Sequence, residues 1–426
     1  MPPSVTGLDL CAVFAGAAGG CTSGRPGYGC SRGVPRAVSV AGMGGQRSDG
    51  GPATERSDWR PCSESADVCA PRVRVVGGIG EVEAECWNAL AGADDFYMSH
   101  EWLASIERDR VARARYVLAL AGDRLIGALP IYRLLYEGGT FYQNQRFRTL
   151  LGIEGDHLVA GSRLCNRGGV LLADDLRADV GEQTVRVLLQ AALAVAEGEG
   201  LHGIVLPYLP AAQVQRIRRA AWVVAARDDA EAIVSGASVG VDAYVERLPK
   251  KRRYYARQER DRYAKAGWRS GVEPLAGCVP EVARLVSEVN RRHGDTVPDF
   301  LLRRIFRWEA RAVGPRAVVL TCRDERGALV ACAVDFVWRD MLYLHAVGLD
   351  HERLRDSFEY FNLMIYRAIE YASEHGLDRL HLGLVTRAKT LRGAVANPLW
   401  TAAVLCGTAG RAPGVRFVDG SADTGM

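Results

Sequence analysis

One order of sequence patterns occurs twice in this chain, and the two copies lie about two hundred residues apart. In each copy, amphipathic helical segments lead into runs that alternate apolar and polar residues, and these lead into a long helix and a closing strand. The alternating runs are loosely similar, as in VLALAGDRLIGALPIY (117–132) and VVLTCRDERGALVACAVDF (318–336). A repeat of this length predicts a duplicated α+β domain, with mixed sheets flanked by helices, rather than a short-period solenoid.

The first copy contains one turn and one helix start that the residue types mark clearly. Gly122 and Asp123 separate two alternating runs, which predicts a β-hairpin. Ser99 precedes a helical period and is expected to cap that helix, because its hydroxyl can accept a backbone N–H of the first turn. The other expected segments are a strand at 73–78, a helix at 81–92, a strand at 168–174, a helix at 176–200, a strand at 201–209 and a helix at 210–222.

The second copy opens with a strongly basic helix. Pro249 suits the first turn of a helix, and Gly267 is expected to end it. The remaining expected segments are a strand leading to Pro280, helices at 281–294 and 298–311, three strands within 316–349, a long helix at 357–376 and a strand at 377–384.

Composition divides the chain into four expected parts. Residues 1–70 are rich in Gly, Ser, Arg and Pro without a hydrophobic period, so a disordered tail is expected there. No Lys or Arg precedes the apolar run of this tail, which argues against an export signal, and Met43 is an alternative start. The two domains are expected at 71–238 and 239–410, with the active site in the second, and a flexible tail is expected at 411–426.

Overall charge and cysteine usage exclude several classes of protein. The formal net charge is only +4, so the chain as a whole is not a polycation. No apolar run approaches the roughly 18–20 residues that span a bilayer, and a cytoplasmic location is expected. The eleven Cys form no CxxC and no pairing with His, so no metal site is expected. No tightly bound cofactor is expected either. The sequence does not indicate an oligomeric state.

The basic segment 250–265 allows three interpretations. On a helix, Lys250, Arg253, Arg257 and Arg260 form one stripe. The stripe is either a solvated face whose side-chain stems cover apolar surface, a site for the phosphates of a tRNA end or a phosphorylated substrate, or a general nucleic-acid surface. Arg253 and Arg257 are the substrate-binding candidates of the second interpretation.

Two titratable residues stand in the apolar strands of the second copy. His345 shares a face with Tyr343 by alternation, and a neutral imidazole there could accept a proton from an amine. Asp335 lies on a mostly apolar strand and could bind or deprotonate an amine. The alternatives are a core histidine that is fully hydrogen-bonded and a strand-end carboxylate in a structural ion pair.

The chain from about residue 95 to residue 400 resembles the Fem-type branch of the GNAT acyltransferases, which have tandem GNAT-like domains and include aminoacyl-tRNA-dependent transferases. The residues that carry the resemblance are the basic helix, the segment LYLHAVG, the helix EYFNLMIYRAIEYASEHG and the segment RAKTLRG. Lys389 and Gly393 keep the family spacing of a Lys four residues before a Gly. Ala388 stands where relatives often have an aromatic residue.

The resemblance implies direct transfer of an acyl or aminoacyl group to an amine, without a covalent enzyme intermediate. Lys389 would then supply positive charge near the carbonyl of the donor, with a surface lysine as the alternative. Arg387 and Arg392 flank it and are candidate substrate contacts. Tyr343, Tyr360 and Asn362 are further candidate contacts, the last two at the start of the long helix.

The donor is expected to be an aminoacyl-tRNA rather than an acyl-CoA. Ordinary GNAT enzymes hold pyrophosphate in a glycine-containing loop before the long helix, but here that stretch reads DHERLRDSFEYF. The expected acceptor is a cell-wall precursor or a secondary metabolite with a free amine. The alternatives are an acetyl-CoA-dependent GNAT acetyltransferase and a non-catalytic GNAT-like binding protein.

Overall fold

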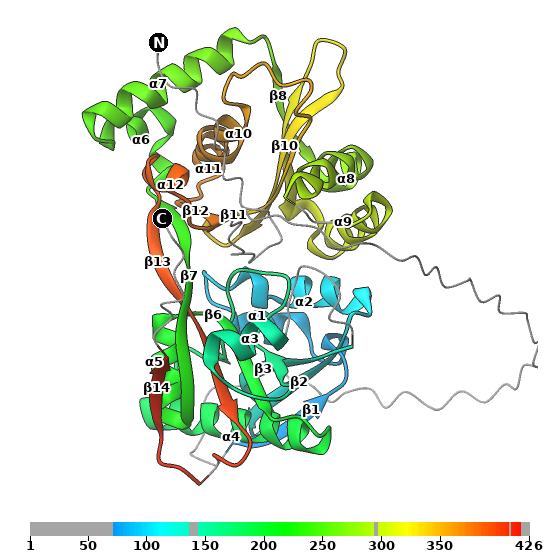
Figure 1. Cartoon of the computed structure of the whole chain (residues 1–426), viewed down its shortest axis with the longest axis vertical. Coiled ribbons are helices and arrows are strands. Elements are labelled where there is room, and N and C mark those ends of the chain that lie inside the picture. The colour runs from blue at the N-terminus through cyan, green and yellow to red at the C-terminus, as the bar shows by residue number, and fades with distance from the viewer. Residues whose placement is uncertain (1–70, 136–143, 294–296, 409, 419–426) are drawn as a thin grey trace, which may run out of the picture.

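The computed structural model describes residues 71–135, 144–293, 297–408 and 410–418, and Figure 1 shows two lobes joined by long strands. The tail expected at residues 1–70 lies outside the described residues. The elements of the N-terminal half are β1 (Arg72–Val76), η1 (Ile79–Glu81), α1 (Ala84–Leu90), η2 (Phe96–Met98), α2 (His100–Ile106), η3 (Glu107–Asp109), β2 (Ala112–Ala121), β3 (Arg124–Leu134), α3 (Asn144–Leu151), β4 (Leu158–Ala160), β5 (Leu171–Leu172), α4 (Ala178–Gly198), β6 (Gly203–Pro210), α5 (Ala211–Ala220) and β7 (Trp222–Ser235).

The C-terminal half repeats the succession of helices, antiparallel strands, helix and strand. Its elements are η4 (Ala237–Val239), α6 (Val241–Arg247), α7 (Lys250–Lys265), β8 (Arg269–Pro274), α8 (Leu275–Arg292), α9 (Asp299–Val313), η5 (Gly314–Arg316), β9 (Ala317–Arg323), β10 (Leu329–Trp338), β11 (Met341–Leu349), α10 (Glu359–Phe361), the π-helix η6 (Asn362–Arg367), α11 (Ala368–Glu374), β12 (Arg379–Leu384), α12 (Arg387–Thr390), β13 (Val395–Leu405) and β14 (Gly414–Val418). The predicted α+β fold with mixed sheets and flanking helices is confirmed.

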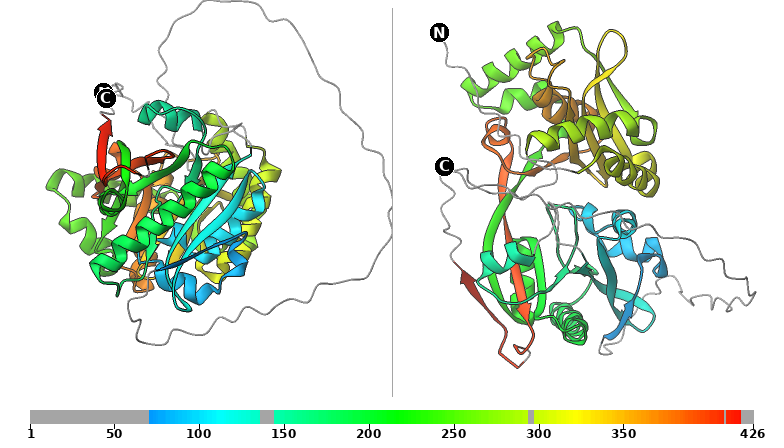
Figure 2. Two further views of the ribbon diagram at one scale, coloured as in Figure 1. Left: turned by 90° about the horizontal axis from the view of Figure 1, so that it is seen from below. Right: turned by 45° about the vertical axis from the view of Figure 1, so that its right-hand side comes forward.

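One mixed sheet of 14 strands runs through both halves of the described chain. Its order is β1-β2-β3-β4-β6-β13-β7-β12-β11-β10-β9-β8, with β5 on β3 and β14 on β7. The long strands β7 and β13 pass from one lobe into the other (Figures 1 and 2). As a result β13, from the end of the chain, lies between β6 and β7 in the sheet of the N-terminal half.

Aromatic side chains from both halves share one core. Phe96 of the N-terminal half stacks on Phe336 of β10, with ring centroids 4.9 Å apart, and both rings are fully buried. The indole N–H of Trp338 donates to the carbonyl of Gly92 at 2.9 Å. The two halves are therefore joined by packing and hydrogen bonds as well as by the shared strands.

Local sequence signals account for several of these elements. Ser99 caps α2 as expected, because its Oγ accepts the backbone N–H of Trp102 at 3.2 Å. The hairpin of β2 and β3 turns at Gly122, whose positive φ of 60° suits glycine. The basic helix α7 spans Lys250–Lys265, directly after Pro249, as predicted.

Three segments differ from the sequence-based expectation. Helix α8 begins at Leu275 rather than after Pro280, because Leu275, Cys278, Val279 and Val282 form a buried stripe at helical spacing. The long helix expected at 357–376 contains the π-helix η6, which periodicity does not reveal. Gly414–Val418, placed in the C-terminal tail, form β14 and pair in parallel with β7, whereas residues 419–426 lie outside the described residues.

Within the described residues, no helix combines the length and the apolar character that crossing a membrane requires.

Candidate functional site

Two neighbouring strands of the C-terminal half separate part-way along their length. β11 and β12 run in parallel but pair only from Met341 opposite Arg379 to Tyr343 opposite His381. Beyond that point β11 continues against β10, and β12 continues against β7 with an irregularity between His381 and Leu384. Diverging strands leave backbone carbonyls without ladder partners, so this end of β12 needs other donors.

Lys389 supplies those donors. Its Nζ donates to the carbonyl of Leu382 at 2.6 Å and to the carbonyl of Leu384 at 2.7 Å, and the residue is only 6% exposed. The short helix α12 presents Lys389 in this position, with Thr386 as its N-cap. A buried ammonium group therefore lies where β11 and β12 separate. Lys389 is thus not the exposed surface lysine that was the alternative interpretation of the sequence.

The glycine four residues after Lys389 is required by close packing. Gly393 has a φ of 97°, and a Cβ at this position would lie 2.3 Å from the hydroxyl oxygen of Tyr244. That hydroxyl donates to the carbonyl of Arg392 at 2.6 Å. A glycine four residues after Lys389 thus lets the chain that follows α12 pack closely against α6.

His381 of β12 belongs to a buried cluster of charged groups, together with Glu231 and Arg167. Nε2 of His381 is 3.3 Å from Oε2 of Glu231 on β7, and a guanidinium nitrogen of Arg167 is 2.5 Å from Oε1 of the same carboxylate. Glu231 and His381 are 3% and 1% exposed. Burial raises the pKa of Glu231, but the hydrogen bond from His381 and the charge of Arg167 outweigh it and lower the pKa to about 2. The carboxylate of Glu231 is therefore ionised at neutral pH.

The hydrogen bonds of His381 define its role in this cluster. Nδ1 accepts the backbone N–H of Gly383 at 3.3 Å, so Nε2 carries the proton that faces Glu231 when the ring is neutral. The ring also stacks on Tyr343 of β11, with centroids 5.2 Å apart. His381 therefore positions the backbone of Gly383, whose φ is 74°, between the two carbonyls that Lys389 holds.

A second carboxylate on β7 is partly buried. Asp229 is two residues before Glu231 and projects from the same side of the strand. Burial raises the pKa of Asp229, and the positive charge of Lys389 opposes that shift. A carboxylate whose pKa is raised by burial is a suitable proton acceptor for an ammonium group.

His345 and Asp335 lie away from this cluster. His345 is in the shared aromatic core, with Nε2 at 3.3 Å from Oε1 of buried Glu309 on α9. Asp335 is 1% exposed on β10, and burial raises the pKa of its carboxyl group well above the usual range. Its Oδ2 atom has no hydrogen-bond partner among the described residues, so the structural ion pair of the alternative interpretation does not form there.

Tyr343 is buried and contacts the cluster through its stack on His381, while its hydroxyl donates to the carbonyl of Ala93 at 3.2 Å. Burial raises the pKa of this hydroxyl. Arg387, by contrast, is exposed at the start of α12. Of the two, only Arg387 presents a charge to solvent beside Lys389.

Arg392 and Asn362 belong to a second buried network, around Glu259 of α7. Nε of Arg392 donates to the Glu259 carboxylate at 2.9 Å, and the hydroxyl of Tyr366 donates to it at 2.7 Å. The amide of Asn362 donates to the backbone carbonyl of Glu259 at 3.2 Å. Tyr360 is half-buried beside Phe361, with ring centroids 5.1 Å apart. The network ties α7 to the π-helix η6 and to the chain after α12.

Arg253 and Arg257 do not form an open cationic stripe. Both donate to the carboxylate of Glu246 on α6, Arg253 at 3.0 Å. Arg260 of α7 donates to the carboxylate of Asp242, which also lies on α6, at 2.6 Å. Two carboxylates of α6 therefore offset part of the charge of these three arginines, whose side chains remain partly exposed.

A family model for FemAB-like proteins, described as peptidoglycan biosynthesis/recognition, matches residues 78–418. The chain belongs to the FemAB-like family. The predicted Fem-type resemblance is confirmed, and the chain is assigned as an acyltransferase of this family. No curated protein matches the sequence.

Several solved structures are similar to this FemAB-like chain. FemX is 11% identical and aligns with a TM-score of 0.53 over 75% of this chain and 96% of its own. A tandem GNAT protein from the clavulanic acid biosynthesis pathway is 13% identical, with a TM-score of 0.44 over 80% of this chain and 99% of its own. L-PGS from Bacillus licheniformis is 12% identical, with a TM-score of 0.43 over 65% and 81%.

The buried cluster of the FemAB-like chain was not singled out from its sequence. His381 stands within the predicted strand 377–384, and the carboxylates of β7 stand in the run ARDDAEAIV, where acidic residues interrupt an apolar strand. That interruption is the signal that could have identified Asp229 and Glu231. Arg167 lies in the loop between β4 and β5, and nothing local marks it.

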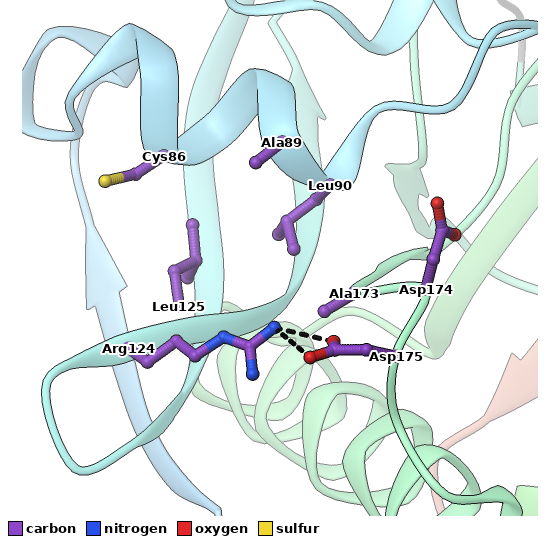
Figure 3. A pocket seen from close by; sticks show the side chains of 8 residues that line it. All are labelled: Cys86, Ala89, Leu90, Arg124, Leu125, Ala173, Asp174 and Asp175. Carbon is purple, nitrogen blue, oxygen red and sulfur yellow. Dashed lines mark hydrogen bonds and ion pairs between the residues drawn. The ribbon is translucent and has the colours of Figure 1, made fainter. Parts of the chain in front are cut away.

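A pocket of about 200 Å³ lies elsewhere in the FemAB-like fold, between α1 and the β2–β3 hairpin (Figure 3). Arg124 closes one side through its ion pair with Asp175, whose oxygen it reaches at 2.6 Å. None of the cluster residues lines this pocket. Among the described residues, no group of three or more His, Cys, Asp or Glu could hold a metal ion.

Proposed function

We propose that this FemAB-like chain transfers an aminoacyl group from an aminoacyl-tRNA to an amine of a cell-wall precursor. The family match supports a peptidoglycan-related acyltransferase. The finer assignment of the donor rests on one structural observation at the start of the helix formed by α10, η6 and α11.

The carboxylate of Glu359 occupies the turn at the start of that helix. It accepts the backbone N–H groups of Arg355 at 2.9 Å and Ser357 at 3.1 Å. It also accepts the hydroxyl of Ser357 at 2.8 Å and the indole N–H of Trp268 at 3.2 Å. Glu359 is 3% exposed, and its own carboxylate accepts the hydrogen bonds that this turn could otherwise donate to a bound anion.

This occupancy disfavours an acyl-CoA donor. In ordinary GNAT enzymes the turn before this helix holds pyrophosphate through backbone N–H groups. A pyrophosphate here would have to displace a buried carboxylate that already has four donors, and it would meet that negative charge. An aminoacyl ester of a tRNA end does not require this turn.

The cluster at the end of β12 suits the chemistry of amide formation. The amine nitrogen bonds to the ester carbonyl, the ester C–O bond breaks, and the ribose hydroxyl leaves with a proton. Asp229 takes the proton that the attacking ammonium group must lose. Lys389 supplies positive charge toward the developing oxyanion, and His381 with Glu231 holds the Gly383 backbone beside it.

The test compares the two donors directly. The full chain is incubated with an amine-bearing cell-wall precursor and either a mixture of aminoacyl-tRNAs or acetyl-CoA, and the products are identified by mass. The proposal expects a product with one added aminoacyl residue and no acetylated product. Acetylation with acetyl-CoA, or no transfer from any aminoacyl-tRNA, would overturn it.

A Glu359→Ala variant gives a matched comparison, because it opens the turn while leaving the end of β12 unchanged. Calorimetry should show weak or undetectable acetyl-CoA binding by the parent and tighter binding by the variant. Equal and tight binding by both proteins would show that Glu359 does not exclude the pyrophosphate.

A further inference from the structure

The outer face of α9 carries one stripe of basic and aromatic side chains. Phe300, Arg304, Arg307, Trp308 and Arg311 follow the spacing i, i+4, i+7, i+8 and i+11, which places them on one side of a helix. Phe300 is 72% exposed, the highest value among the large hydrophobic residues of the described chain. We call these five residues the α9 stripe.

The opposite face of α9 holds the helix in the core. Leu302, Phe306, Glu309, Ala310 and Val313 are buried. The helix packs beside α8 on the outer flank of the C-terminal lobe, as Figures 1 and 2 show. The α9 stripe is therefore fixed on a rigid, outward-facing surface rather than on a loop.

The arginines of the α9 stripe have no acidic partner among the described residues. Arg304 lies over the ring of Trp308, with 4.7 Å from its guanidinium carbon to the ring centroid. On α7, by contrast, Arg253 and Arg257 share the carboxylate of Glu246, which offsets part of their charge. Arg253 and Arg257 of α7 thus face an acidic partner on α6, whereas the three arginines of the α9 stripe face none among the described residues.

We propose that the α9 stripe docks this protein on the surface of an anionic lipid bilayer. Three arginines along one helix face complement anionic headgroups, and the projecting Phe300 can insert at the headgroup level. The three arginines span about 10 Å along the helix axis, so all can contact one flat surface at the same time.

A single-stranded nucleic acid fits the α9 stripe less well. Such ligands stack successive bases on a series of aromatic rings along a basic groove. Here one ring projects at one end of the stripe, and Arg304 already covers the Trp308 ring. The docking surface is separate from the end of β12, so its test does not depend on the proposed reaction.

The experiment measures partition of the full chain into sedimented vesicles at low salt. Vesicles of phosphatidylglycerol with phosphatidylcholine are compared with vesicles of phosphatidylcholine alone. The chain should bind the anionic vesicles and lose binding as salt increases. Arg304→Gln combined with Arg307→Gln should weaken binding roughly 25-fold, about five-fold per arginine.

Arg253→Gln combined with Arg257→Gln is the matched control, because it removes the same charge from an exposed helix whose arginines are already paired. This control should bind vesicles within about two-fold of the parent. Phe300→Ser should weaken binding while leaving its salt dependence unchanged, since it removes no charge. Thermal unfolding of each variant verifies that it is folded.

Three outcomes would overturn the proposal. The parent chain could fail to bind anionic vesicles at low salt, or the two double variants could lose binding equally. Binding of single-stranded RNA that is lost only in the α9 double variant, without vesicle binding by the parent, would assign the surface to RNA instead.

Discussion

Glu231 and His381 are 150 positions apart in the chain, yet Oε2 of the first lies 3.3 Å from Nε2 of the second. The contact joins β7, which begins in the N-terminal half, to β12 of the C-terminal half. Arg167 adds a third charged group from the loop after β4. The end of β12, where Lys389 lies, is therefore held by residues from both halves of the molecule.

We expect Glu231→Gln to destabilise the protein at pH 7 by about 3 kcal/mol, because the change leaves the buried Arg167 without its closest counter-charge. Chemical denaturation measures the change. The control is Glu246→Gln, which affects a half-exposed carboxylate and should cost less than about 1 kcal/mol. A similar, small effect of both substitutions would show that the buried pair contributes little.

Protonation of Glu231 should also lower the stability of the protein at acid pH. The pKa of Glu231 is about 2 in the folded chain and 4.5 as an ordinary glutamate. The ionised carboxylate contributes about 3 kcal/mol to the free energy of unfolding. This contribution is complete above pH 4.5 and is lost as the pH falls toward 2. The difference in unfolding free energy between parent and Glu231→Gln should therefore shrink over that range. A difference independent of pH between 5 and 2 would contradict this assignment.

Lys389→Met should lower turnover and also cost about 2 kcal/mol of stability, since the carbonyls of Leu382 and Leu384 lose their donor. Binding of aminoacyl-tRNA should change less than turnover, because the proposed role of Lys389 is at the reacting carbonyl. Filter retention measures binding, and product mass measures turnover. Arg387→Met, an exposed change on the same short helix, should leave stability unaltered. A Lys389→Met protein with full turnover would remove Lys389 from the reaction.

Replacing Arg253 and Arg257 together by Ala should change the unfolding free energy by less than about 1 kcal/mol, because their pairs with Glu246 are solvent-exposed. If these arginines leave Glu246 to bind donor phosphates, each loss should reduce the salt slope of tRNA binding by about one unit. Glu246→Gln should then strengthen tRNA binding. Unchanged binding and slope in both variants would show that this face of α7 is only a solvated surface.

Asp335→Asn should stabilise the protein, and the gain should increase with pH. Burial holds the pKa of Asp335 well above its usual range, so the folded chain takes up a proton that the unfolded chain has released. That uptake lowers stability as the pH rises above the ordinary value of 3.8, and asparagine avoids it. Unfolding measured from pH 4 to pH 8 tests the sign. A constant difference would show that the carboxyl group ionises normally.

Local signals in the sequence predicted local structure well. The cap at Ser99, the hairpin turn at Gly122 and the start of α7 after Pro249 each depend on neighbouring residues, and all three occur as expected. The π-helix η6 escaped prediction because its extra residue per turn hardly alters an apolar pattern over six residues.

The site was harder to predict, since its members meet only through tertiary structure. Lys389 could be named from a family spacing, but its two carbonyl partners depend on how far β11 and β12 stay paired. The stripe of Arg253 and Arg257 looked open in the sequence because Glu246 stands in α6, which periodicity did not identify. Charge on a helix predicts a binding surface only when the neighbouring helix is known.

The position of β13 also sets the order in which the molecule can be completed. The strand enters the N-terminal sheet between β6 and β7, although ribosomes make it some 160 residues after β7. Until Val395–Leu405 have been synthesised, β6 and β7 lack their common neighbour and expose unpaired strand edges. The sheet of the N-terminal half therefore cannot be completed before β13 is synthesised, and β13 follows strands β8 to β12 of the C-terminal half in the chain.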